Sequence, residues 1–540
     1  MKKRRILRNL LAVLLCAVCV LGCLAPASAA TVQNYPIVYV MGRTWIYDKI
    51  STDSPELINY STDGAMKNMI TAAIPYAANA ILTGNWDTYN EKTYAMLMDV
   101  YKGFALNENG EIINDTGILF KWSEDKLPKT YSATAVNTYQ FEYDARLSPL
   151  EIADQLNDYI EAVKRVTGKK KVSLIGRCLG TNEMFAYLYK YQEKVNYSGI
   201  ASVVIYDGSL YGVDMLDAAM GGKIKADSYA LGKFLNNYSE SADISSTLAN
   251  AMRLLQTGYG ITLSASVVDS FYSNIRDTLV LRFLKSTYAT CPGFWSMVYK
   301  NYAEAKAYIF SEEGDLLKYS RLIEKIDNYR KNVQLRIPKM IEDMQAKGVY
   351  VSAVCKYGFQ SYPIYEDAYE LSDKLTSLSR QSLGATCSKV DGTLSASFIK
   401  NCQQNLLTGD FISPDKQVYS FTGLLPYTTW YIKNLEHISF PACVNPLFTQ
   451  LCRNQIKIYD VEKYPQYLVY IKDDGVEQII PMTENNCDPT GVMGLDGNSN
   501  NTGDSPSSSS SGSLLQRLLN VVAFFGGIIS RLFGWLRGNN

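Results

Sequence analysis

The chain of 540 residues contains one histidine, His437, and beyond its first 30 residues no two cysteines at CxxC spacing. Zinc modules need several histidines or paired cysteines, and no glycine-rich nucleotide loop is visible either. We therefore expect neither a metal nor another cofactor. Lysine and arginine number 53, as do aspartate and glutamate, so no net charge attracts the protein to nucleic acid. Nucleic acid is excluded as an expected partner.

The N-terminus has the pattern of a secretory signal. Basic residues in MKKRR precede an apolar stretch and the small residues 27–30. This pattern predicts a signal peptide over residues 1–30 and an exported protein, either secreted or held at the cell surface or membrane. A second reading is a lipoprotein signal, because residues 20–23, VLGC, resemble a lipobox that would leave a lipidated Cys23.

Eight cysteines lie beyond the leader, and they are scattered. Extracellular disulfides are therefore conceivable, but the sequence does not determine their pairing. If Cys178 is a free thiol, at least one other cysteine is unpaired or pairs between molecules. The eight are Cys178, Cys291, Cys355, Cys387, Cys402, Cys443, Cys452 and Cys487.

Strand and helix patterns alternate through the first part of the chain. Apolar β-branched runs predict buried strands, and a helical period covers residues 150–166 and 181–191. Without hairpin turns between them, these elements predict an α/β fold with a mostly parallel sheet and helices on both faces. The expected strands are 35–42, 136–144, 170–176, 200–206, 349–358 and 429–434.

The remaining segments complete the expected domain organisation. Residues 31–455 form one α/β domain, and helical periodicity over about 211–346 predicts a cap inserted into it. Residues 456–487 are expected to form a β-hairpin extension packed on this domain, with its turn at 473–475. Residues 488–512 are rich in serine, glycine and asparagine and predict a disordered linker.

The C-terminal segment 513–540 predicts an amphipathic helix, because its polar residues recur every three or four positions. Its uncharged stretch, residues 518–530, is 13 residues long, short of the roughly 20 that span a bilayer. We expect a helix lying in a membrane surface, or else packing on protein or another subunit.

The segment Gly176-Arg177-Cys178-Leu179-Gly180 has GxSxG spacing with cysteine in the serine position. This spacing serves a nucleophile on a tight turn between strand and helix, where larger residues at the glycine positions would clash. The apolar run before the segment and the helical pattern after it match this context. A small buried cysteine without chemistry is the alternative reading.

The stretch FEYDARLSPLEIADQLNDYIEAVKRVTGKKKVSLIGRCLGTNEMFAYL resembles the lipase and acyltransferase branch of the α/β hydrolases, with a likeness that covers about residues 35–445. Residues 143–146, YDAR, stand where that branch has YDWR. Cysteine at the elbow is similar to dienelactone hydrolases and polyhydroxyalkanoate synthases. The chain also resembles uncharacterised exported hydrolases of Gram-positive bacteria. The resemblance implies an α/β-hydrolase fold.

The resemblance also implies the remaining site residues. His437, after the last expected strand, takes the place of the catalytic histidine. Asp410 or Asp415 is expected to orient it, with Asp410 favoured by its motif. The backbone amides of Leu179 and Arg43 are expected to form an oxyanion hole.

These residues predict a Cys-His-Asp acyl hydrolase that forms a covalent acyl-enzyme. Its expected partner is an ester, thioester or lactone, conceivably lipidic. Two other functions stay open: a non-catalytic cell-surface binding protein with this fold, and an acyltransferase or peptidase.

Overall fold

The computed structural model describes residues 34–42, 45–58, 63–101, 103–128, 138–231, 258–404 and 409–487. The expected signal peptide, the linker 488–512 and the helix 513–540 lie outside these residues, as does Arg43. Among the described residues, no helix has the length and apolar character needed to cross a membrane.

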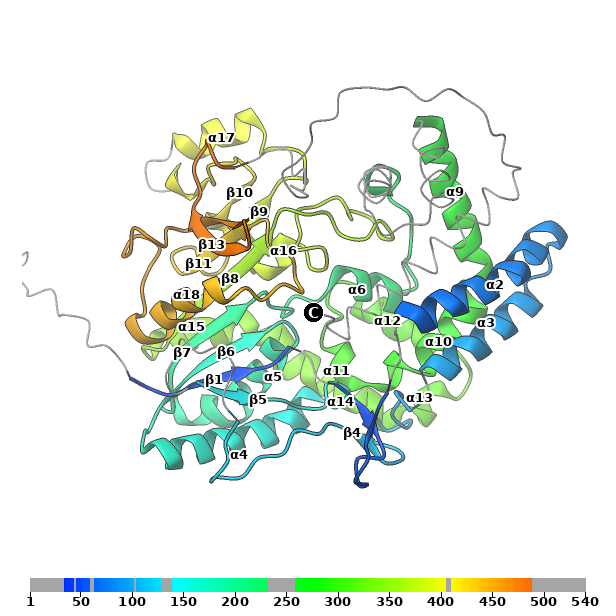
Figure 1. Ribbon diagram of the computed structural model, residues 1–540, viewed down its shortest axis with the longest axis horizontal. Coiled ribbons are helices and arrows are strands. Elements are labelled where there is room, and N and C mark those ends of the chain that lie inside the picture. The colour runs from blue at the N-terminus through cyan, green and yellow to red at the C-terminus, as the bar shows by residue number, and fades with distance from the viewer. Residues whose placement is uncertain are drawn as a thin grey trace, which may run out of the picture.

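An eight-stranded sheet runs through the molecule in the order β13-β12-β11-β8-β7-β6-β1-β5 (Figure 1). All neighbouring strands pair in parallel except β12 and β13. The expected α/β class with a mostly parallel sheet is therefore confirmed. The strands are β1 (Ile37–Val40), β5 (Thr138–Phe141), β6 (Val172–Arg177), β7 (Ile200–Tyr206), β8 (Tyr350–Tyr357), β11 (Thr429–Lys433), β12 (Tyr467–Asp473) and β13 (Val476–Pro481).

Each face of the sheet carries its own apolar core. Val38 and Leu174 belong to one core, whereas their neighbours Ile37 and Ile175 belong to the other. Successive side chains of a strand point to opposite faces, so both faces are buried. Helices α4 (Pro149–Thr167), α5 (Gly180–Tyr187) and α15 (Ile337–Ala346) contribute to the first core, and α17 (Ala396–Gln403), α18 (Asn445–Thr449) and η9 (Gln450–Asn454) to the second.

Helix α4 shows how local sequence sets these elements. It begins after Ser148, which forms a capping box with Glu151, and Pro149 occupies the first turn. It ends at Gly168, whose φ of +65° suits glycine. Helix α4 thus covers the helical period expected over residues 150–166.

Between β7 and β8 the described residues, 207–231 and 258–349, contain several helices and no strand. These helices include α6 (Asp214–Met220), α9 (Gly258–Ile275), η3 (Arg276–Val280), α10 (Leu281–Lys285), α11 (Pro292–Trp295), α12 (Tyr302–Ile309), α13 (Asp315–Lys318), α14 (Ser320–Asn332) and α15. The early helices α2 (Asp63–Thr83) and α3 (Asp87–Val100) lie beside them (Figure 1). Trp86 packs on Phe271, and Asn90 Nδ2 donates to Thr278 Oγ1 at 2.8 Å.

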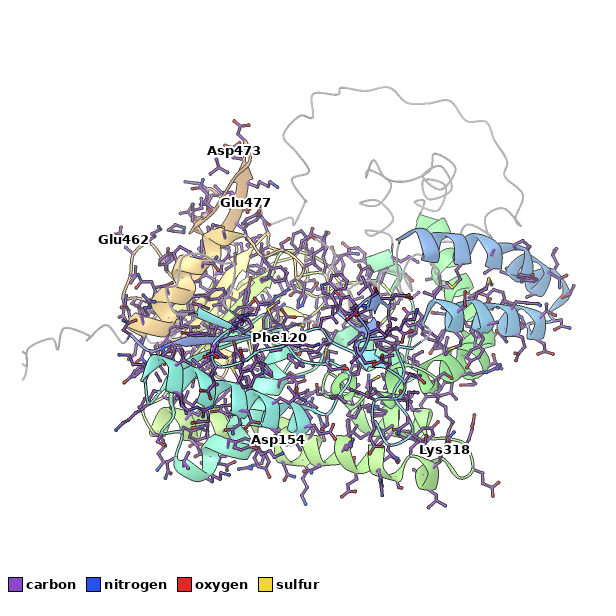
Figure 2. The ribbon with its side chains drawn as sticks, turned by 60° about the horizontal axis from the view of Figure 1, so that its bottom comes forward. Phe120, Asp154, Lys318, Glu462, Asp473 and Glu477 are labelled. Carbon is purple, nitrogen blue, oxygen red and sulfur yellow. The ribbon has the colours of Figure 1, made fainter. Side chains whose placement is uncertain are left out.

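Strands β12 and β13 form the expected hairpin, with Asp474 and Gly475 in its turn at positive φ. Strand β12 also pairs with β11, so the hairpin extends the central sheet. Its far end, marked by Asp473 and Glu477, projects beyond the body of the protein (Figure 2). Two small sheets lie apart from the central one: β2 (Tyr47–Asp48), β3 (Glu56–Leu57) and β4 (Thr116–Gly117), and β9 (Thr386–Cys387) with β10 (Val418–Tyr419).

Candidate active site

Cys178 lies on a sharp turn between β6 and α5. Its φ is +46°, a conformation that costs a residue with a side chain about 1 to 2 kcal/mol. The turn is held because the Cys178 amide donates to Tyr206 O at 3.0 Å and the Thr181 amide donates to Cys178 O at 3.0 Å. The sulfur-bearing residue therefore occupies a strained turn at the carboxyl end of a buried strand.

The two glycines of the motif are required by close packing. A Cβ on Gly176 would lie 2.9 Å from Thr181 Cα, and one on Gly180 would lie 2.5 Å from Val40 O. Gly42, after β1, would clash with the same turn if it carried a Cβ. Backbone contacts of this kind cannot relax by side-chain rotation. The spacing found in the sequence thus has a steric cause.

The amide of Leu179 is available beside the sulfur. Leu179 is the N-cap residue of α5, and its amide donates to no residue in the described ranges. Amides in the first turn of a helix have no partner within that helix and can bind a developing negative charge. The second expected donor, Arg43, lies outside the described residues.

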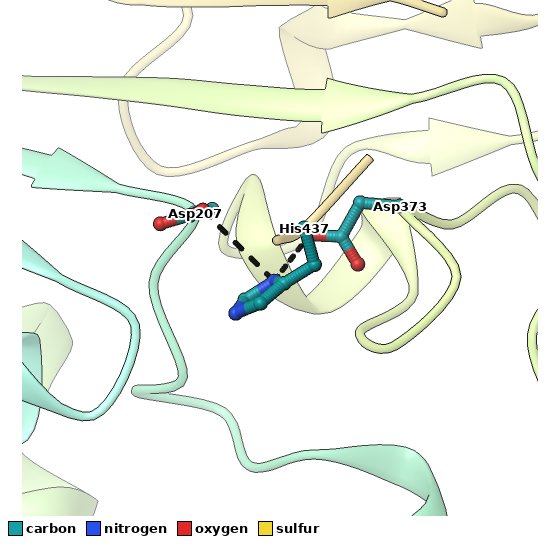
Figure 3. A group of neighbouring side chains, drawn as sticks. All are labelled: Asp207, Asp373 and His437. Carbon is teal, nitrogen blue, oxygen red and sulfur yellow. Dashed lines mark hydrogen bonds and ion pairs between the residues drawn. The ribbon is translucent and has the colours of Figure 1, made fainter. Parts of the chain in front are cut away.

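His437 is held by Asp373, a residue that the sequence analysis did not select. His437 Nδ1 lies 2.6 Å from Asp373 Oδ2, and the His437 amide donates to Asp373 O at 2.8 Å. The other carboxylate oxygen of Asp373 accepts the amides of Leu375 and Thr376. The second ring nitrogen of His437 points away from the carboxylates (Figure 3). Asp373 therefore fixes the orientation of the ring.

The charges around His437 favour its protonated form. Burial alone lowers the pKa of His437, but the charges of Asp373, Cys178 and Asp207 raise it to about 10. At neutral pH the ring is therefore an imidazolium. The contribution of Cys178 also places its sulfur within electrostatic range of the ring. The loop of His437 and the turn of Cys178, 259 positions apart in sequence, lie at one edge of the sheet, where Arg177 Nη2 is 2.9 Å from His437 O.

The structure does not bring either predicted acid into contact with His437. Asp410 is exposed on the short helix η6 (Gly409–Phe411), away from the buried ring. Asp415 is buried, but its Oδ2 lies 3.0 Å from Lys433 Nζ and accepts the Tyr357 hydroxyl at 2.9 Å. A buried lysine needs a counter-ion, and Asp415 serves that purpose.

A second carboxylate stands beside the ring. Asp207 follows β7 directly, and its Oδ2 lies 3.9 Å from His437 Nδ1, 2.8 Å from Lys356 Nζ and 3.6 Å from Arg177 Nε. Burial raises the pKa of Asp207, but Lys356, Arg177 and His437 together lower it below the ordinary value. Asp207 is therefore an anion, balanced by two cations.

Lys356 also holds the loop that carries His437. Its Nζ donates to His437 O at 3.1 Å and to Ser439 O at 2.9 Å. Arg177, on the elbow strand, donates from Nη2 to His437 O at 2.9 Å. Two cations thus tie the histidine loop to β8 and to the turn of Cys178, which makes Lys356 a positioning residue.

Replacing Lys356 by methionine is expected to lower kcat/KM about 100-fold on any acyl substrate that is turned over, because misplacing a catalytic group by about 1 Å has this effect. The matched control is Lys433→Met, which removes an equally buried lysine from the neighbouring strand without touching the His437 loop. Both variants are expected to lose stability. Equal loss of activity in both, measured well below their unfolding midpoints, would contradict the positioning role.

The same cluster has the composition of a metal site. One ligand atom each from Asp207, Asp373 and His437 lies within 4.8 Å of the others. However, Nδ1 of His437 is already engaged by Asp373, and Lys356 and Arg177 supply positive charge at Asp207. The donor set fits an internal charge network better than a cation.

Sequence reasoning missed both carboxylates. Asp207 had a usable signal, because it follows a buried strand directly and so lies at the edge where Cys178 lies. Asp373 had none, since its loop after β8 carries no motif. A scan of protein-family models and a search of curated proteins find no significant match to the chain.

Proposed function

We propose that the chain is an α/β hydrolase with Cys178, His437 and Asp373 as its catalytic triad. Support comes from the order of elements: the nucleophile follows β6, the acid follows β8 and the histidine follows β11, all at the carboxyl edge of parallel strands. This is the chain order of nucleophile, acid and histidine in that fold. The observation that carries the proposal is the 2.6 Å contact between His437 and Asp373, with Cys178 in range of the ring.

The chemistry begins from an ion pair. In the proposed mechanism His437 holds the proton of the Cys178 thiol before the substrate is attacked. The thiolate attacks the acyl carbonyl carbon, and the Leu179 amide binds the oxyanion. The bond to the leaving group breaks as His437 gives that group its proton. Water then attacks the thioester, His437 takes a proton from the water, and the acid is released.

The substrate class proposed is an ester, thioester or lactone, with acyl transfer to another acceptor as the variant reaction. Ile438 and Phe440 follow His437 in the same loop and are 44% and 39% exposed. An apolar rim of this kind suits an acyl chain. Export of the protein and attachment to a membrane surface through residues 513–540 belong to the same proposal.

Alkylation by iodoacetamide tests the ion pair directly. Cys178 is expected to react faster than partly exposed Cys402 at pH 6.5, although Cys178 is only 3% exposed. In His437→Ala the rate at Cys178 is expected to fall about 100-fold at pH 6.5, two units below the ordinary thiol pKa, and to recover near pH 9.5. Peptide mass spectrometry after timed quenching gives the rate at each cysteine.

The sign of this pH effect follows from His437. Its pKa is raised to about 10, so the imidazolium is present throughout the range below that pH and is lost above it. If Cys178 labels no faster than Cys402 and the His437 variant behaves like the wild type, the enzymatic account fails. The chain would then be a binding scaffold with this fold.

A further inference from the structure

Three buried polar groups near Cys178 have no hydrogen-bond partner among the described residues. They are both carboxyl oxygens of Glu183 and the hydroxyls of Tyr143 and Tyr329. Glu183 and Tyr143 are 0% exposed and Tyr329 is 3% exposed. A buried polar group without a partner costs about 1 to 3 kcal/mol, and native proteins contain few of them. Three such polar groups on elements near Cys178 therefore point to a binding site.

The three groups come from elements that meet around the turn of Cys178. Glu183 lies on α5, Tyr143 lies just after β5, and Tyr329 lies on α14. Two hydrogen bonds to one residue link α5 to η5 (Gln334–Arg336), the short helix that follows α14. Asn182 Nδ2 donates to Ser296 Oγ at 2.8 Å, and Gln334 Nε2 donates to Ser296 O at 2.7 Å.

The end of β5 is tied to the same place. The Gly293 amide on α11 donates to Arg146 O at 3.2 Å, three residues after Tyr143. A Cβ on Gly293 would overlap Ala145 O, so α11 packs directly on this segment. Helix α11 in turn contacts α14. The elements that carry the three polar groups thus surround one region beside the elbow.

Electrostatic effects place the groups within range of one another and of the sulfur. Burial raises the pKa of Tyr143 well above its usual value, and Glu183, Cys178 and Tyr329 raise it further. Burial also raises the pKa of Tyr329, and Glu183 adds to this effect. None of these groups hydrogen-bonds to another, so each has hydrogen-bonding capacity that a bound polar group can use.

We propose that Glu183, Tyr143 and Tyr329 form a subsite for a primary ammonium group on the acyl donor of Cys178. The proposal rests on the acyl-transfer chemistry proposed above and narrows its substrates to aminoacyl esters or thioesters and peptides with a free amino group near the scissile carbonyl.

An ammonium group matches these three residues in its hydrogen bonds, its charge and its attraction to aromatic rings. An ammonium has three N–H donors, and the Glu183 carboxylate and two phenol oxygens supply three acceptors. Its positive charge compensates the Glu183 carboxylate, which would otherwise be costly to bury. Tyrosine rings also attract cations. In the free protein burial raises the pKa of Glu183 well above its usual value, and the positive charge of a bound ammonium opposes this effect.

Two acyl groups that differ only in the ammonium test the subsite. Alanyl and isobutyryl 4-nitrophenyl thioesters are close isosteres, because the amino group of one replaces a methyl of the other. The wild type is expected to prefer the alanyl thioester at least 10-fold in kcat/KM. Glu183→Gln and Tyr143→Phe are expected to bring the ratio towards one. Tyr159→Phe is the matched control, because its buried hydroxyl donates to Pro128 O and Gln140 O away from the subsite.

A second measurement does not depend on turnover. Calorimetric titration of Cys178→Ala with alaninamide and with isobutyramide is expected to show binding of the amine alone, and Glu183→Gln in that background is expected to abolish it. Binding without turnover would refute the catalytic proposal and leave the subsite standing. Turnover of both thioesters at equal rates, with no alaninamide binding, would refute the subsite and leave the enzyme.

Stability separates a binding role from a structural one. Tyr143→Phe removes a hydroxyl without a partner, so its unfolding midpoint is expected to stay level or rise. Tyr159→Phe loses two hydrogen bonds and is expected to have a lower midpoint. If the unfolding midpoint of Tyr143→Phe falls as far as that of Tyr159→Phe, the Tyr143 hydroxyl has a structural partner and the proposed subsite is refuted.

Discussion

Replacement of Asp373 by asparagine is expected to lower kcat/KM about 10⁴-fold, an effect of the size seen when the acid of such a triad is neutralised. The cause lies at His437 Nδ1, which is 2.6 Å from Asp373 Oδ2. An asparagine presents either a neutral oxygen or an NH₂ group there, so the imidazolium loses its nearest countercharge. Initial rates on a chromogenic thioester across pH 5 to 10 measure the effect.

Two variants serve as controls for this prediction. Asp410→Asn alters an exposed carboxylate and is expected to change activity less than twofold. Asp415→Asn leaves Lys433 buried without its anion, so it is expected to lower the free energy of unfolding by about 3 to 5 kcal/mol while retaining most activity at low temperature. If Asp415→Asn inactivates a folded protein and Asp373→Asn does not, the triad is assigned to the wrong carboxylate.

The central sheet was predictable because its signals are local. Each buried parallel strand is a short apolar run, such as residues 200–206, which match β7 residue for residue. The helices between β7 and β8 were also predictable from a local signal, because their apolar residues recur with the helical period. What local patterns do not give is the pairing of distant strands. The hairpin 467–481 was expected as an extension, but its first strand pairs with β11 and becomes part of the main sheet.

In the candidate site, too, some residues could be predicted from local sequence, whereas others are brought close only by the fold. Cys178 and its glycines could be found because sterics fix their spacing over five residues, and His437 could be found because the chain has no other histidine. The acid could not be found, since any aspartate on a loop after β8 satisfies the chain order. Asp410 and Asp415 stood nearer to His437 in sequence, whereas Asp373, 64 positions away, is nearer in space.

The charges explain why so many ionisable groups are buried together. Asp207 and Asp373 contribute two negative charges, and each has a cation beside it: Lys356 for Asp207 and the imidazolium of His437 for Asp373. Removing one partner of either pair leaves the other charge buried in a medium of low dielectric constant. Fixed charges of this kind need no reorganisation during the reaction, which favours catalysis over stability.

Replacement of Cys178 by serine is expected to lower kcat/KM by about 10⁴-fold or more, comparable to removal of a triad nucleophile. A thiol can give its proton to His437 and remain an anion, whereas a serine hydroxyl is too weak an acid to do so. In this variant the charges of Asp373 and Asp207 still raise the pKa of His437, although the contribution of Cys178 is lost. Single-turnover measurement of leaving-group release detects any remaining acylation, and a serine variant within tenfold of the wild type would contradict the ion-pair mechanism.

The strained turn provides the control for folding. Because the φ of Cys178 is +46°, alanine at this position keeps the strain and glycine relieves it. Cys178→Gly is therefore expected to be more stable than Cys178→Ala by about 1 kcal/mol, the reverse of the usual order of these two residues. Both are expected to be inactive. Urea unfolding of the two variants gives the difference, and an alanine variant as stable as the glycine variant would show that the turn of Cys178 is not strained, removing the main structural sign of a nucleophile elbow.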